Sequence, residues 1–169
     1  MNVRRAEASD AAKLALLGSA TFLSAFASDH PGDALVTHCR DAHSESRYSA
    51  WASDPAYALW IAETPLRAPI GYAMLSPPEL DLVVEPDAVE LKRIYTLGAW
   101  QGRGLGHRLM ETVVAEARSR HAPRLYLCVY ETNDMAQRFY ARHGFTRVGT
   151  QEFMVGDVAF TDWILKREI

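Results

Sequence analysis

The hexapeptide Gln101-Gly102-Arg103-Gly104-Leu105-Gly106 separates two runs of different character. Val89 to Leu97, before it, is typical of a β-strand, and Leu105 to Ser119, after it, has apolar residues at helical spacing, namely Leu105, Leu109, Val113 and Ala117. The glycines predict a tight turn that opens into a helix, and let a ligand approach the backbone closely. The first N–H groups of a helix are unpaired and lie at the positive end of its dipole, so this turn suits a diphosphate.

Two common nucleotide motifs do not fit this turn. A dinucleotide fingerprint that begins at Gly102 requires glycine or alanine at its sixth position, where this chain has His107. A P-loop requires a Gly-Lys pair, and the sequence contains none. Arg103 and Arg108 are near enough in sequence to add charge-assisted bonds to phosphate oxygens, or are solvated surface residues.

The residues before the turn predict a strand, helices and a hairpin. Asn2 to Glu7 reads as a first strand, and Ser9 is expected to cap a helix whose apolar face carries Leu16, Ala20, Leu23 and Ala27. Ser28 to Asp33 breaks this helix, and residues 34–52 suit one or two partly exposed helices. Tyr57 to Ala62 and Ile70 to Leu75 then form an antiparallel hairpin.

The residues after the turn predict a parallel strand, a helix and a closing hairpin. The run Leu125 to Tyr130 should lie parallel to Val89 to Leu97, with a right-handed crossover. Asn133 or Asp134 can cap a helix that ends near His143, with Gly144 in a left-handed conformation. Strands from Phe145 to Val155 and from Val158 to Lys166 turn at Gly156-Asp157. The predicted order is β-α-α-β-β-β-α-β-α-β-β, an α/β fold with a mixed sheet.

Composition bounds the class of protein. The 169 residues, about half of them apolar (49%), suit a single domain over residues 1–169. No signal peptide or bilayer-spanning run is visible, so we expect a cytoplasmic protein with no membrane partner. A net charge of −3 gives no support to nucleic-acid binding. Cys39 and Cys128 lie far apart, and the six histidines have no metal-ligand spacing, so we expect surface or capping histidines and no metal.

The central turn and its surroundings resemble a known family. Gln101 to Gly106 matches the Gln/Arg-x-x-Gly-x-Gly/Ala signature of the GCN5-related N-acetyltransferases (GNAT), and the element order is similar from end to end. The resemblance implies a GNAT fold, with splayed strands around its central parallel pair, and acetyl-CoA as co-substrate. It places the pantetheine arm along Ile94, Tyr95, Thr96 and Leu97. The diphosphate would lie within Gln101, Gly102, Arg103, Gly104, Leu105, Gly106 and His107.

The helix after Leu125 to Tyr130 supplies the second half of the resemblance. Asn133, Ala136, Phe139, Tyr140 and Gly144-Phe145 are similar to the family pattern Asn-x-x-Ala-x-x-Phe-Tyr-x-x-x-Gly-Phe. This similarity implies that Asn133, Ala136 and Phe139 approach the CoA arm and that Tyr140 protonates the departing thiolate. Arg142 is expected near the adenosine phosphate end.

A narrower resemblance concerns the acceptor. Glu90 to Tyr95, together with Val155-Gly156-Asp157 and Thr161-Asp162, looks like the PaiA-type polyamine and diamine acetyltransferases. Thr96 and Trp100 depart from the usual family residues. The implied acceptor is a small primary amine, and dimers are common in the family, so a homodimer is possible.

Transfer to an amine requires removal of a proton from an ammonium group whose pKa is near 10.4. Glu90 is the leading candidate base, because some family members carry a catalytic glutamate on this strand. The alternatives are that Glu90 binds cationic charge electrostatically, or that it pairs with Lys92 or Arg93. For Tyr140 the alternative is a structural hydrogen bond. A strand amide near Tyr95 to Leu97 would polarise the carbonyl.

The acceptor region is less defined by the sequence. Five carboxylates precede or begin the central strand and would attract a polyamine, or form a solvated acidic loop: Glu79, Asp81, Glu85, Asp87 and Glu90. Aromatic residues that line an acceptor cleft or fill the core are Phe22, Phe26, Tyr48, Trp51 and Trp60. Two other functions are possible, namely transfer to a protein or peptide amine, and a non-catalytic acyl-CoA-binding module.

Overall fold

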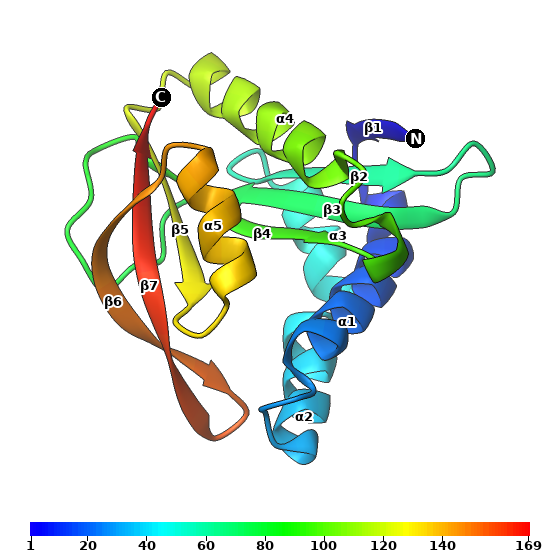
Figure 1. Ribbon diagram of the computed structural model, residues 1–169. Coiled ribbons are helices and arrows are strands. Elements are labelled where there is room, and N and C mark those ends of the chain that lie inside the picture. The colour runs from blue at the N-terminus through cyan, green and yellow to red at the C-terminus, as the bar shows by residue number, and fades with distance from the viewer.

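A computed structural model describes residues 1–169 as a seven-stranded mixed sheet in the order β1-β2-β3-β4-β5-β7-β6, with helices on both faces (Figure 1). The strands are β1 (Asn2–Arg5), β2 (Ala58–Glu63), β3 (Pro69–Ser76), β4 (Val89–Thr96), β5 (Arg124–Tyr130), β6 (Thr146–Val155) and β7 (Val158–Glu168). The helices are α1 (Ala11–Phe26), α2 (Gly32–Ala42), α3 (Glu45–Ser53), α4 (Leu105–Ser119) and α5 (Asp134–Arg142). The 3-10 turns η1 (Ala8–Asp10) and η2 (Gly98–Trp100) precede α1 and the glycine-rich turn. The seven strands follow in the predicted order, but three helices, α1 to α3, lie between β1 and β2 where the predicted order has two.

The sheet opens at its centre. β4 and β5 form the parallel pair, and they are paired only at Val89 with Leu125 and at Glu90 with Tyr126. All other neighbouring strands are antiparallel. Beyond Glu90 the two strands diverge, which leaves a V-shaped gap toward their carboxyl ends. This gap corresponds to the splayed central pair that the family resemblance implies.

Alternating residues divide the core between the two faces of the sheet. On one face, the apolar side of α4 packs on the sheet, and Leu105, Leu109, Val113 and Ala117 are fully buried there as predicted. On the other face, Leu14 and Leu17 of α1 pack with Tyr48 of α3. The gap between β4 and β5 is therefore bordered by α4 and α5 on one side and by α1 to α3 on the other (Figure 1).

The first helix differs from the sequence prediction. Ser9 lies within η1, and Asp10 is the N-cap of α1, so the predicted Ser9 cap is wrong. The predicted apolar face is also wrong, because Leu16 is 68% exposed and Leu23 is 40% exposed. The buried face carries Leu14, Leu17 and Phe22. α1 is apolar on both faces, so spacing alone does not distinguish them.

The remaining boundaries are close to the prediction. α2 begins at Gly32, so the break after α1 is shorter than the predicted Ser28 to Asp33. Residues 34–52 form parts of two helices, α2 and α3. Gly144 follows α5 with φ of 80°, and Gly156 lies in the β6–β7 turn. None of the helices combines the length and apolarity that crossing a membrane requires.

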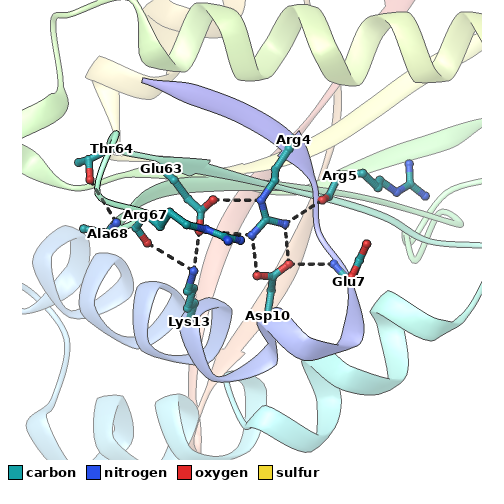
Figure 2. A network of polar contacts seen from close by, with 9 residues as sticks. All are labelled: Arg4, Arg5, Glu7, Asp10, Lys13, Glu63, Thr64, Arg67 and Ala68. Atoms are coloured by element: carbon teal, nitrogen blue, oxygen red, sulfur yellow. Dashed lines mark hydrogen bonds and ion pairs between the residues drawn. The ribbon is translucent and has the colours of Figure 1, made fainter.

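A polar network joins the start of the chain to β2 (Figure 2). The Arg4 guanidinium donates to both Asp10 oxygens at 2.7 Å and to Glu63 Oε2 at 3.0 Å. Lys13 Nζ donates to Glu63 Oε1 at 2.6 Å. The pKa of Asp10 falls to about 2, chiefly because of the Arg4 hydrogen bonds. These contacts tie β1, η1, α1 and β2 together.

Candidate active site

A set of unpaired backbone amides lies at the start of α4. The N–H groups of residues 102 to 107 donate to no backbone carbonyl, whereas the next one, Arg108 N–H, bonds to Gly104 O at 3.1 Å. Gly104 is the N-cap, with φ of 78°. No atom lies within 4 Å of a Cβ built at Gly104, so the outer side of the turn is open. Free donors at a helix N-terminus and an open approach fit a diphosphate.

The turn is held against α5. A Cβ built at Gly106 would lie 3.6 Å from Phe139 Cε2, so the first turn of α4 lies on the Phe139 ring. His107 Nδ1 lies 3.4 Å from His143 Nε2 at the end of α5. The two halves of the motif, about thirty residues apart, are therefore adjacent in the fold.

The basic residues near the turn occupy different positions. Arg103 lies over the Trp100 ring, 5.6 Å from its centroid, beside the turn. Arg108 donates to Met1 O at 3.3 Å, which directs it toward the chain start. Arg142 is exposed in the last turn of α5. Arg103 is thus the arginine on the turn itself, and Arg142 is on the neighbouring helix.

β4 presents a free edge to the gap. Its other edge is paired with β3, where Leu97 N–H donates to Ile70 O at 3.0 Å. Because backbone groups alternate in direction along a strand, the N–H groups of Ile94 and Thr96 point away from β3, toward the gap. Gln101 Nε2 lies 3.5 Å from Thr96 O. An extended arm bound in the gap would find strand donors here, and Thr96 N–H is placed to polarise a carbonyl.

Tyr140 projects from α5 and is 9% exposed. Its hydroxyl makes no hydrogen bond to another residue of the chain, so the structural bond considered as an alternative is absent. Burial raises the pKa of Tyr140 far above its ordinary value, and the charges of Tyr95, Asp162 and Cys128 raise it further. A phenol in this environment stays protonated and can donate its proton.

Asn133 and Ala136 form the start of α5. Asn133 is the N-cap, and its Oδ1 accepts from Ala136 N–H at 3.1 Å. The predicted cap at Asn133 is therefore confirmed. Ala136 and Phe139 pack against the core beneath α4. These contacts hold α5, which carries Tyr140, against the core on the α4 side of the sheet.

Glu90 lies where β4 and β5 are still paired. Its side chain is 3% exposed, Oε2 accepts from Glu79 N–H at 2.8 Å, and Oε1 is 3.4 Å from Lys92 Nζ. Burial raises the pKa of Glu90, while Lys92 opposes this shift. The pairing with Lys92, one of the alternatives for this carboxylate, is present.

The acidic segment before β4 forms local contacts at the closed end of the gap. Glu79 pairs with Lys92 at 2.9 Å. Glu85 accepts from Tyr126 Oη at 2.6 Å and lies 3.5 Å from Arg124 Nε. Part of the negative charge of this acidic segment is therefore already balanced by basic residues of β4 and β5.

Aromatic side chains connect α1 and α2 to the closing hairpin. The His30 ring stacks on Phe160 with centroids 3.6 Å apart, and it meets Tyr130 with centroids 5.4 Å apart.

Burial lowers the pKa of His38 to about 4 and that of His43 to about 3. The prediction of surface or capping positions is wrong for His30, which is buried; His43 is buried too, but it is the C-cap of α2.

The aromatic residues considered for an acceptor cleft are mostly core. Phe22, Tyr48 and Trp60 are buried, and Phe26 and Trp51 are partly buried. Trp60 packs on the α4 face, opposite to Tyr48.

A hollow of about 600 Å³ lies between α2 and the β6–β7 turn. It is lined by Asp33, Ala34, Thr37, His38, Asp41, Met154, Gly156 and Asp157. None of its three aspartates forms an ion pair, and no lysine or arginine lines it. The hollow therefore has an unbalanced negative lining.

Asp162 is a candidate that sequence reasoning did not single out for catalysis. It lies on β7 opposite Tyr130 of β5, is 8% exposed, and has a pKa raised to about 7 by burial and by the charge of Glu131. The only signal in the sequence was its place in the tail motif Thr161-Asp162. The pairing of β5 with β7 places it beside Tyr130, the last residue of β5.

The chain matches the model of the Acetyltransferase (GNAT) family over residues 22–145. It is 35% identical to an uncharacterized N-acetyltransferase of Mycobacterium tuberculosis (strain ATCC 25618 / H37Rv) over 126 residues, which covers 75% of this chain and 76% of that protein. It is 33% identical to the spermine/spermidine N(1)-acetyltransferase of Bacillus subtilis (strain 168) over 86 residues, or 50% of this chain and 57% of that protein. The fold is similar to the crystal structure of PaiA N-acetyltransferase from Thermoplasma acidophilum in complex with coenzyme A, with a TM-score of 0.82, 16% identity, and coverage of 99% of this chain and 98% of that chain.

Proposed function

We propose that this chain acetylates a polyamine or another small primary amine. The chain belongs to the Acetyltransferase (GNAT) family and is an acetyl-CoA-dependent N-acetyltransferase. The observation that carries the choice of acceptor is the hollow between α2 and the β6–β7 turn. Its three unpaired aspartates would attract a partner with several positive charges. The Bacillus subtilis relative, a spermine/spermidine N(1)-acetyltransferase, supports the same class of acceptor.

The residues around the gap would hold the co-substrate in an extended form. The free amides of residues 102 to 107 would bind the diphosphate, and the β4 edge from Ile94 to Leu97 would lie along the pantetheine arm. Ala136 and Phe139 would border it from α5. When bound, acetyl-CoA supplies an activated acetyl group as a thioester.

Transfer would proceed directly from thioester to amine. Thr96 N–H would donate to the acetyl carbonyl oxygen, and Tyr140 would give its proton to the departing sulfur. Neither thiol is suited to carry the acetyl group, because burial raises the pKa of both Cys39 and Cys128. Glu90 would contribute negative charge to the acceptor side, and its pairing with Lys92 supports an electrostatic role over direct proton removal.

Acceptor profiling tests this proposal. Purified protein is incubated with acetyl-CoA and a panel of spermine, spermidine, short diamines, monoamines and peptides, and CoA thiol release is followed. We expect turnover with diamines and polyamines at lower KM than with monoamines of equal chain length. If the cationic amines all fail while a peptide turns over, the acceptor assignment is wrong.

A further inference from the structure

Asp162 is a buried carboxylate without a protein partner. Its side chain makes no hydrogen bond or ion pair, whereas the carboxylates of Glu63, Glu85 and Glu90 all do. The two buried side-chain atoms that lack both a hydrogen-bond partner and solvent contact are His43 Nε2 and Arg124 Nε. Because the Asp162 oxygens are not among them, they still reach solvent. An ionised carboxylate in such a place is costly unless a ligand completes it.

Asp162 lies on the side of the sheet that α1 and α2 cover. It shares a face of the sheet with Tyr130, its partner on β5, and Tyr130 contacts Phe26 and His30 at 6.0 and 5.4 Å between ring centroids. Tyr140 comes from the opposite side, on α5. The charge of Asp162 contributes to the raised pKa of both Tyr140 and Tyr95, so the carboxylate lies close enough to act on both hydroxyls.

We propose that Asp162 is the general base that takes a proton from the acceptor ammonium, opposite to Tyr140 across the gap between β4 and β5. This inference rests on the proposed function, because it requires an amine acceptor. A base and an acid on opposite sides of the reacting carbon match the two proton transfers of the reaction.

The ammonium loses one proton to an Asp162 oxygen, and the free pair on nitrogen forms the C–N bond to the acetyl carbonyl carbon. The C–S bond breaks, its electron pair leaves with sulfur, and sulfur takes the Tyr140 proton. The nitrogen releases a second proton, through water, to Tyr140, and Asp162 returns its own to solvent. The net products are the amide, the CoA thiol and one proton.

The surroundings of Asp162 suit a base that works near neutral pH. Burial is the main cause that raises its pKa to about 7, and the charge of Glu131 at the end of β5 adds to it. The other groups that face it are Tyr130 and Cys128 on β5, Tyr95 on β4, Tyr140 on α5, Gln151 on β6, and His30 behind Tyr130. No cation is paired with it.

Glu90 lies on the same face of the sheet as Asp162, but at a different place along the strands. It lies at the paired end of β4 and β5, and both of its oxygens already have partners in Glu79 N–H and Lys92 Nζ. Asp162 lies beside the last residue of β5, where the strands have diverged.

The test is the pH dependence of kcat/KM for the best amine of the panel, in the wild type, Asp162→Asn and Glu90→Gln. We expect the wild-type value to rise through a limb with a pKa near 7, and Asp162→Asn to lose that limb and about 10² to 10⁴ in kcat near neutral pH. The kcat/KM that remains in Asp162→Asn should rise with pH in proportion to the fraction of the acceptor amine that is already deprotonated. Glu152→Gln is the matched control, because this exposed residue lies on β6 on the opposite face from Gln151.

Each outcome bears on the inference separately from the proposed function. If the wild type accepts no polyamine but acetylates another amine, the acceptor assignment fails while the Asp162 test still runs on that amine. If Asp162→Asn keeps the limb, or raises KM alone, Asp162 is not the base. Loss of the limb in Glu90→Gln alone would transfer the role to Glu90.

A second measurement does not depend on activity. Because the folded-state pKa of Asp162 is raised, its contribution to stability is present at low pH and is lost as pH rises through about 7. Asp162→Asn should therefore melt at higher temperature than the wild type at pH 8 and gain less at pH 5. Equal melting differences at the two pH values would contradict the unpartnered buried carboxylate.

Discussion

Gly106 in the first turn of α4 lies against the Phe139 ring of α5, and a Cβ built there would be 3.6 Å from Cε2 and 3.7 Å from Cζ. This is ordinary van der Waals contact, so one methyl group fits and a branched side chain does not. The contact joins the turn that would hold the diphosphate to the helix that carries Tyr140.

Gly106→Val should weaken CoA binding about tenfold or more, because the branched side chain would push α4 away from α5. Gly106→Ala should bind CoA nearly as well as the wild type. Calorimetric titration with CoA measures both. Gly98→Ala is the control, because its Cβ would meet no atom within 4 Å. Equal affinities for the Val and Ala variants would show that the contact does not position the turn.

Gly104→Ala should weaken CoA binding and destabilise the start of α4. The φ of 78° at Gly104 costs a residue with a side chain about 1–2 kcal/mol. Gly104→Asn is the matched comparison, because asparagine tolerates this conformation better than alanine. We expect the order of affinity Gly, Asn, Ala in the same titration. An alanine variant that binds CoA as tightly as the wild type would contradict this role of the turn.

Tyr140→Phe should lower kcat by about 10² near neutral pH without changing CoA affinity, because it removes the proton donor and keeps the ring. Tyr126→Phe is the control, since its hydroxyl bonds to Glu85 at the closed end of the gap. Stopped-flow assays in which chemistry is rate-limiting should be compared across pH. Unaltered turnover in Tyr140→Phe would remove this residue from the mechanism.

Neutralising the hollow should affect polyamines selectively. Combined replacement of Asp33, Asp41 and Asp157 by asparagine should raise KM for spermidine about tenfold, because each exposed carboxylate contributes at most about 1 kcal/mol to binding a cation. KM for a monoamine should change little. The difference should shrink at high ionic strength. A parallel rise for both acceptors would indicate a structural effect instead.

The Arg4 network should make stability depend on pH. The folded-state pKa of Asp10 is about 2 against an ordinary 3.8, so its contribution is present above about pH 4 and is lost as pH falls toward 2. Asp10→Asn should lower the free energy of unfolding by about 1–2 kcal/mol at pH 7, and its loss of stability between pH 4 and 2 should be smaller than in the wild type. Denaturant titrations at several pH values measure this. Identical pH profiles would contradict the pairing.

Local signals allowed much of the site to be predicted. Three features depend only on residues that are close together in the chain, so the sequence indicates them directly. They are the glycines of the turn, the apolar stripe of α4 that begins at Leu105, and the Asn133 cap. The predicted roles of Tyr140 and Glu90 remain predictions. The buried face of α1 was not predictable, because its apolar residues lie all round the helix and only packing against the sheet selects Leu14 and Leu17.

The sequence by itself determined the order of the strands and the set of free amides at α4, because backbone conformation and hydrogen bonding there depend on neighbours in the chain. Only the tertiary structure decided which carboxylates face the gap. Pairing of β5 with β7 brings Asp162 to its open end, and pairing with Lys92 engages Glu90 at its closed end. Burial and the charge of distant residues set the pKa of a side chain, and neither exists until the sheet has formed.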